Sequence, residues 1–469
     1  MVGRSSWIDA STQVTTGMKP FVRIVELGAA FLCSNLARAA IGFGLTLAIG
    51  RGLGADRFGA WILCTTWAST LTTLADLGFG VLLTRDGSRV DADPVRLLTG
   101  ALALRLVVAI PLGVALAIGA GALSSNAEAI AALRIAGLLG ISGAAYGCFG
   151  ALFRSQPRWL PTVLGVETVW LAVQLATAWS LVHSGRGVVA LVTLAAAVQL
   201  AQIATAVVLW RLVFGRNPEP KNENENENEN PNPNQNSNAE PRTLNPEPRH
   251  LHLTPMLRRA LPFAATGLVA NLQLRVAPLM LGAMAMPAEL GWFGAASRVG
   301  QAVRLAPHAI LGGALPVLSR EYGIDRSAAH SVSRTLDRAL TALSLCGAIA
   351  LALLAAPLMR LLFGAPFAAA GPALIWVAIG LAPAVSNASR KTFLFAAGAE
   401  TFVLRWTTVA LAIQVVLAAA LIPVFGAAGA AAGVAIGEAA IWWPLQCANP
   451  ERHGLKAVPY IRENDPVSV

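Results

Sequence analysis

The chain is short of charge. Only 13% of its 469 residues are Asp, Glu, Lys or Arg, whereas 55% are hydrophobic. Soluble globular domains carry about 25% charged residues, so a soluble protein of this composition would have too little polar surface. We therefore expect an all-α integral membrane protein, because a helix satisfies its backbone hydrogen bonds internally within a bilayer.

Cysteine and histidine are also scarce, with five Cys and six His in the sequence. The cysteines lie within or beside apolar runs and lack the paired spacing of a zinc site or a disulfide framework. We predict no metal and no cofactor, and we interpret the cysteines as small core residues. They are Cys33, Cys64, Cys148, Cys346 and Cys447. No cleavable signal peptide is expected, because the first apolar run is too long for one.

A polar low-complexity segment, KNENENENENPNPNQNSNAE from Lys221 to Glu240, divides the chain. Its composition is too polar to fold, which predicts a disordered tether. Six apolar runs on each side are long enough to cross a hydrocarbon core of about 30 Å. The predicted spans are 24–49, 58–84, 97–121, 129–153, 159–183 and 187–214, then 257–286, 289–319, 335–363, 367–396, 402–425 and 427–447. The expected parts are an N-tail (1–23), a six-helix bundle (24–215), the tether (216–256), a second six-helix bundle (257–447) and a C-tail (448–469).

The basic residues orient these twelve spans. Most of the 35 lysines and arginines lie in the tails, the tether and one alternating set of loops. The positive-inside rule therefore places both termini and the tether in the cytoplasm. The net charge of +10 is explained by topology, and we expect no nucleic-acid partner. The predicted outer side holds four basic residues, Arg51, Arg57, Arg186 and Arg360.

Six arginines fall inside predicted spans, where an ionised side chain costs on the order of 3 kcal/mol. Two of them, Arg105 and Arg134, lie near span ends, and snorkelling toward the interface would explain them. The other four lie deeper and require a polar environment. They are Arg38, Arg275, Arg298 and Arg304.

The predicted span 289–319 carries a polar stripe. At 100° per residue its polar side chains fall within an arc of about 120°, and the rest of the helix is apolar. We interpret the stripe as the wall of a polar cavity, and a buried structural network is the alternative. Its residues are Ser297, Arg298, Gln301, Arg304 and His308.

The first and seventh spans each carry an amide and a guanidinium on one face. Asn35 and Arg38 are three residues apart, and Asn271 and Arg275 are four apart. The few intramembrane acids do not match the arginines in number. Excess positive charge favours an anionic ligand, and guanidinium groups bind phosphate oxygens in bidentate fashion. A diphosphate head group is therefore the predicted ligand.

Three intramembrane carboxylates, Asp76, Glu167 and Glu438, are candidates for coupling to protons or sodium ions. Asp76 lies near the predicted cytoplasmic end of its helix, and pairing there with Arg85 or another neighbour is the favoured interpretation. Glu438 lies in the middle of its span and is the better coupling candidate.

The first hairpin reads GRGLGADRFGAW from Gly50 to Trp61 and is followed by DLGFG from Asp76 to Gly80. It resembles the opening of polysaccharide-export flippases of the Wzx type, which share a superfamily with MurJ lipid II flippases and MATE exporters (the MOP superfamily). The second half repeats the pattern, with Gly291 in the place of Gly59. The tether is not part of the resemblance, and neither are the extra helices that MurJ carries after its twelfth span.

The resemblance implies two six-helix bundles, related by an internal repeat, facing each other in a V. It implies a flippase, not an enzyme, that moves undecaprenyl-diphosphate-linked oligosaccharide across the bacterial cytoplasmic (inner) membrane by alternating access. The product would be a cell-surface polysaccharide such as lipopolysaccharide O-antigen or exopolysaccharide. The expected partners are this lipid-linked cargo, membrane lipid, and other polysaccharide assembly proteins. The deep arginines, together with the neighbouring amides and His308, would receive the diphosphate and sugar.

Two other functions stay open. A MATE-like multidrug or cation antiporter has the same expected fold, but a cationic cavity repels cations. The first span also lacks a central Asp, which the resemblance implies for the MATE-type mechanism. A membrane polysaccharide polymerase or ligase would also be basic and multi-pass. Such an enzyme would need a large catalytic loop outside the membrane, and the predicted outer loops are short.

Overall fold

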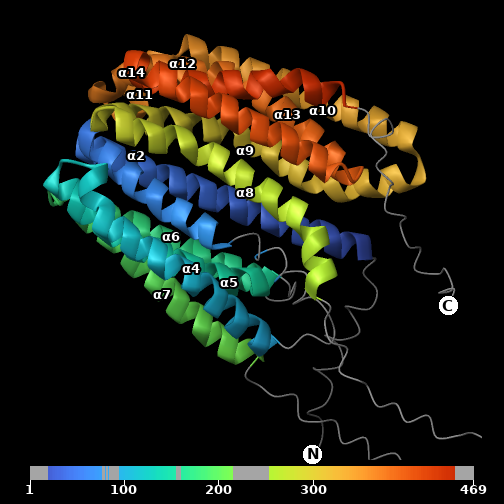
Figure 1. Cartoon of the computed structure of the whole chain (residues 1–469), viewed down its shortest axis with the longest axis horizontal. Helices are drawn as coiled ribbons and strands as arrows, with labels where there is room; N and C mark the ends of the chain where they lie inside the picture. The colour runs from blue at the N-terminus through green and yellow to red at the C-terminus, as the bar shows by residue number, and fades with distance from the viewer. Residues whose placement is uncertain are drawn as a thin grey trace, which may run out of the picture.

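The computed structural model is helical throughout the residues that it describes, which are 20–76, 80, 83, 94–154, 160–214 and 253–448. The tether from Lys221 to Glu240 and most of both tails lie outside these residues. The first half contains α2 (Pro20–Asp76), α4 (Pro94–Leu123), α5 (Ala127–Arg154), α6 (Leu160–His183) and α7 (Val188–Phe214). The second half contains α8 (Leu253–Met284), α9 (Pro287–Ile324), α10 (Arg326–Leu353), α11 (Ala355–Phe363), the short η2 (Ala365–Ala370), α12 (Gly371–Ile379), α13 (Leu381–Ala396) and α14 (Glu400–Gln446). Figure 1 shows the two halves side by side, with their helices running in similar directions.

Two helices are too long to be single spans. α2 has 57 residues and α14 has 47, whereas about 20 residues cross a bilayer core. Each is interrupted by a glycine with positive φ, Gly54 at 72° and Gly426 at 52°, a conformation that favours glycine because it has no Cβ. Both breaks fall between predicted spans.

The number of spans depends on how these helices are divided. Nine helices of the described residues are long and apolar enough to cross a membrane, or ten when α9, which bends by 40° near Pro316, is included. α2 and α14 are each long enough for two spans and are each broken at a glycine. The chain is therefore a multi-pass membrane protein with a helical fold.

The two halves meet at glycines that are equivalent in the internal repeat. A methyl group at Gly59 would overlap the carbonyl oxygen of Pro287, and one at Gly291 would overlap the carbonyl oxygen of Ala55. Gly59 and Gly291 occupy equivalent positions in the internal repeat, and at the same residue spacing Ala55 is equivalent to Pro287. Equivalent backbone segments of α2 and α9 therefore pack directly on each other, as small residues permit within membranes.

The packing is shared at one end of the molecule and separate at the other. The largest buried cluster joins both halves near Gly54 and Gly426, and it includes Phe58, Phe293 and Phe363. Toward the opposite end, one cluster around Phe153 belongs to the first half alone and another around Val403 belongs to the second. The two halves therefore share a buried core at one end and have separate cores at the other, which is the expected V-shaped arrangement.

The cysteines do not all lie in the core. Cys64 and Cys148 are buried, but Cys346 and Cys447 are exposed. The core interpretation was therefore wrong for these two, because an apolar helix in a membrane also presents residues to lipid.

Candidate functional site

The polar stripe lies on α9, the helix that packs against α2 of the first half and against α8, α10, α12 and α13 of the second. Arg298 Nη1 donates to Gln301 Oε1 at 3.4 Å, and His308 Nδ1 lies 2.9 Å from the carbonyl oxygen of Arg304. Gln301 and His308 are exposed, and Ser297 and both arginines are partly exposed. The stripe is therefore accessible along its length.

The two arginines of the stripe have little negative charge around them. Neither Arg298 nor Arg304 forms an ion pair with a described residue. Glu438 of α14 lies within electrostatic range of Arg304 but forms no ion pair with it. A buried structural network would match each guanidinium with an acceptor, so this arrangement favours the cavity wall over that alternative.

Arg275 connects the halves. From α8 it donates Nη1 to Ser69 Oγ and Nη2 to Thr73 Oγ1 of α2, the latter at 3.0 Å. Its Nε is buried without a hydrogen-bond partner among the described residues. Hydroxyl groups carry no charge, so these two partners do not neutralise the guanidinium of Arg275. Asn271 instead donates to the carbonyl oxygen of Gly267 in its own helix, at 2.8 Å.

Arg38 has a different environment from the other deep arginines. Its Nη1 lies 2.6 Å from Glu167 Oε2, and Tyr146 donates its hydroxyl to Glu167 Oε1 at 2.7 Å. The Arg38 side chain is 35% exposed, so one face of it stays accessible. Both oxygens of Glu167 are occupied. Asn35 lies on α2, but its side chain falls outside the described part of the chain.

Asp76 pairs with Arg105 of α4, which also donates Nη1 to the carbonyl oxygen of Ala144 at 3.3 Å. The snorkelling expected of Arg105 was wrong, because its side chain is only 4% exposed. The error arose because nothing in the sequence shows that Asp76 of another helix lies beside it. Arg134 is exposed.

Glu438 is surrounded by amides. Gln273 of α8 donates Nε2 to its Oε1 at 2.7 Å, and Asn387 of α13 donates Nδ2 to its Oε2 at 2.8 Å. Gln414 donates to the carbonyl oxygen of Gln273 at 3.0 Å, and Lys391 lies within electrostatic range of the carboxylate. These four neighbours of Glu438 were not among the predicted site residues. The sequence signal that could have identified them was an amide or a lysine inside an apolar run.

Potential metal ligands do not converge anywhere in the described ranges: no group of three or more His, Cys, Asp or Glu side chains could hold a metal ion there. The site residues described above offer guanidinium groups, amides and hydroxyls, which donate hydrogen bonds to anions, and the carboxylate of Glu438.

The family model described as polysaccharide biosynthesis protein matches residues 28–322, more than half of the chain. The chain belongs to the polysaccharide biosynthesis protein family. In this family member the match includes all four deep arginines, whereas Glu438 lies beyond it. Among curated proteins, none matches the sequence.

Solved structures share the fold of this polysaccharide biosynthesis protein at low identity. The lipid II flippase MurJ in an inward closed conformation is 12% identical, with a TM-score of 0.65 over 90% of this chain and 86% of that chain. An inward-facing multidrug resistance MATE family transporter of the MOP superfamily is 14% identical, with a TM-score of 0.61 over 88% and 96%. A MOP superfamily transporter from Pyrococcus furiosus, whose reversed pocket polarity suggests a different function, is 14% identical, with a TM-score of 0.54 over 89% and 93%. The chain therefore has the MOP fold.

Proposed function

We propose that this protein is a flippase that moves an oligosaccharide linked to undecaprenyl diphosphate from the cytoplasmic to the outer leaflet of the bacterial cytoplasmic membrane. The movement is alternating access between the two halves, and the product serves cell-surface polysaccharide synthesis. Membership of the polysaccharide biosynthesis family supports the pathway, and the likeness to MurJ, a lipid II flippase, supports a lipid-linked cargo.

One observation carries the proposal: Arg298 and Arg304 lie on one face of α9 without an ion-pair partner among the described residues. A charge in hydrocarbon costs on the order of 3 kcal/mol even where the helix can adjust. An anionic cargo offsets that cost when it is bound, and a diphosphate offers oxygens to both guanidinium groups. Arg275 and the exposed face of Arg38 add two further donors.

The predicted orientation supports loading of the cargo from the cytoplasmic side. Positive-inside counting places Gly54 and Gly426 on the outer side, where the two halves share their buried core. The space between the halves then opens toward the cytoplasm, from which the cargo comes.

The alternatives explain fewer observations. A MATE-like antiporter shares the fold, but unpaired arginines disfavour an organic cation. A polymerase or ligase needs a large outer loop, and the described connections at that end are short: Ser124–Asn126, Ser184–Gly187 and Ala285–Met286. Both facts favour an anion flippase that is not an enzyme.

The decisive experiment is a flipping assay in proteoliposomes with a fluorescent undecaprenyl-diphosphate sugar. Arg298→Ala and Arg304→Ala are each expected to lower the rate at least about tenfold, because a hydrogen bond to a charged group contributes roughly 1.5–3 kcal/mol. Arg298→Lys and Arg304→Lys should keep part of the activity, since they retain the charge but lose the planar fork. The matched control is Arg134→Ala, at an exposed intramembrane arginine. Normal rates in both alanine variants would refute the anion cavity.

Glu438 is the proposed coupling residue, because Asp76 and Glu167 are each paired with an arginine whereas Glu438 is held by amides. Glu438→Gln should remove the dependence of flipping on a proton or sodium gradient, because a neutral side chain cannot exchange charge with the ion. The control is Glu400→Gln on the same helix. A variant at Glu438 that still responds fully to both gradients would exclude this carboxylate.

A further inference from the structure

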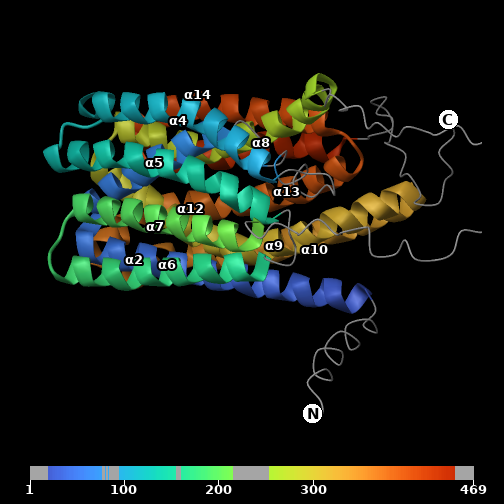
Figure 2. The same ribbon diagram turned by 90° about the horizontal axis from the view of Figure 1, so that it is seen from below.

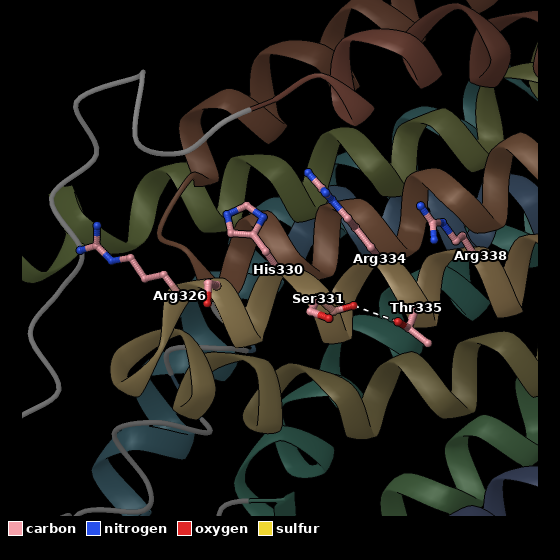
Figure 3. A pocket seen from close by; sticks show the side chains of 7 residues that line it. Arg326, His330, Ser331, Arg334, Thr335 and Arg338 are labelled. Carbon is pink, nitrogen blue, oxygen red and sulfur yellow. Dashed lines mark hydrogen bonds between the residues drawn. The ribbon is translucent and has the colours of Figure 1, made fainter.

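A second basic surface lies on α10, away from the stripe of α9. Four basic side chains follow each other at intervals of one helical turn, and serine and threonine side chains occupy the adjacent face. Together they line a hollow of about 710 Å³. Figure 3 shows the basic side chains in a row along one side of α10. The lining residues are Arg326, Ser327, His330, Ser331, Arg334, Thr335 and Arg338; we term this set the α10 basic face.

Two of these arginines have no neutralising partner. No ion pair or hydrogen bond joins the side chain of Arg334 or Arg338 to a described residue. Arg334 moreover lies close enough to Arg390 to repel it. Arg390 itself is occupied, because it donates Nε to the carbonyl oxygen of Leu445 at 3.0 Å and Nη2 to that of Ala448 at 2.7 Å.

The acids near this surface are already engaged. Asp337 accepts from Ser386 Oγ at 3.0 Å and from Gln446 Nε2 at 3.3 Å. Asp325 caps α10, accepting from the backbone nitrogens of Ser327 at 2.8 Å and Ala328 at 3.1 Å. These hydrogen bonds, that of Ala328 foremost, lower the pKa of Asp325. Neither carboxylate forms an ion pair with Arg334 or Arg338, so these two guanidinium groups are not neutralised by the acids beside them.

α10 packs within the second half. It packs on α9, α12 and α13, all in the second half, and among the described residues no helix of the first half packs extensively against it. Figure 2 shows α10 extending past the ends of α6 and α7. Beyond the basic face, the same helix exposes large apolar side chains. They are Leu343, Leu345, Ile349 and Leu353.

α10 is basic at its start and exposes apolar side chains further along. This order matches one bilayer leaflet, in which charged head groups are followed by acyl chains. We propose that the α10 basic face binds the phosphate of an anionic phospholipid in the leaflet on the predicted cytoplasmic side, with the acyl chains against the exposed leucines and Ile349. Arg334 and Arg338 hold the phosphate. This site is distinct from the cargo site on α9 and does not depend on which cargo is moved.

The test is a titration of the purified full chain in detergent with dye-labelled phosphatidylglycerol or phosphatidylcholine of the same acyl chains. Wild-type protein should bind phosphatidylglycerol more tightly. Arg334→Gln/Arg338→Gln should weaken that binding about fivefold for each arginine removed, the value of one basic residue near an anionic surface. Phosphatidylcholine binding should not change, and Arg334→Lys/Arg338→Lys should retain most of the affinity.

The matched control is Arg211→Gln/Arg405→Gln, which removes two exposed arginines on the same predicted side. An equal loss in the control, or no loss in the α10 variant, overturns the proposal. A loss confined to undecaprenyl diphosphate, with phosphatidylglycerol unaffected, also overturns it and assigns the surface to the cargo. If the double variant does not fold, the wild-type affinity for phosphatidylglycerol must fall as salt is raised, and a salt-independent affinity overturns the proposal equally.

Discussion

At the residue scale, the intramembrane arginines divide by what lies within reach of each guanidinium. Arg105 and Arg38 face carboxylates, Arg275 faces hydroxyls, and Arg298 faces an amide of its own helix. A paired arginine can be structural, whereas an unpaired one needs a ligand to offset its burial. The buried pair of Arg105 therefore fits a stability role, whereas the unpaired Arg298 fits a binding role; Arg38 has both a carboxylate partner and an exposed face.

The Asp76–Arg105 pair provides a stability prediction. Asp76→Asn should destabilise the protein by about 2–3 kcal/mol, because it leaves the buried Arg105 without its counter-charge. The cost should be below that of a fully buried pair, since 38% of the Asp76 side chain is exposed. Thermal unfolding in detergent measures the change, and the exposed Asp56→Asn is the control. The apolar pair Asp76→Leu/Arg105→Met should recover much of the loss; an equally unstable double variant would contradict this reading.

The sequence could identify the deep arginines, because a charge inside an apolar run is visible in one dimension. The sequence could not show that Arg38 has a carboxylate partner and Arg298 has none. The partner of Arg38 lies on α6, and which helices lie beside each arginine depends on helix packing. Ser69 and Thr73 were missed for a related reason. Hydroxyls in membrane helices usually bond to their own backbone, and Thr73 does so while also accepting from Arg275.

At the element scale, the helices and the breaks between predicted spans could be predicted, but breaks within a span could not. Apolar runs separated by glycine predicted the breaks at Gly54 and Gly426. The predicted span 335–363 is instead divided between α10 and α11, and 367–396 between η2, α12 and α13. Hydropathy does not register such breaks, because both sides of each are equally apolar.

The crossing of α2 and α9 gives a prediction about elements. Gly291→Ala should lower stability by about 1–3 kcal/mol, because the added methyl group overlaps the Ala55 carbonyl and the backbones must separate. Gly59→Ala should behave alike, since the contact is nearly symmetric. Gly312→Ala on the same helix is the control, with open space around it. Thermal unfolding would contradict the close crossing if all three variants matched the wild type.

At the scale of the whole molecule, the contacts between the halves concentrate at the end that holds Gly54. Arg51 of α2 donates Nε to the carbonyl oxygen of Leu362 at 2.7 Å. The ring of Phe58 lies tilted to that of Phe363 and edge-on to that of Phe367, with centroids 6.1 and 5.7 Å away. The proposed alternating access requires these contacts to break while the opposite end closes. On that proposal closure at this end is reversible, and a covalent link across it should stop transport.

Gly50 and Phe363 provide that link. A methyl group at Gly50 would lie 2.7 Å from Phe363 Cδ1, so cysteines at these two positions, in a chain without its native cysteines, would be neighbours across the halves, to be joined as a disulfide or through a short disulfide-forming linker. Oxidation of Gly50→Cys/Phe363→Cys should reduce flipping at least about tenfold, and a reductant should restore it, because the halves can then separate again. The control is Gly52→Cys/Val182→Cys, which links α2 to α6 within the first half and should leave the rate unchanged. Full flipping by the cross-linked Gly50–Phe363 variant would mean that this end stays closed throughout transport, and the cargo would then need a route that does not pass between the halves.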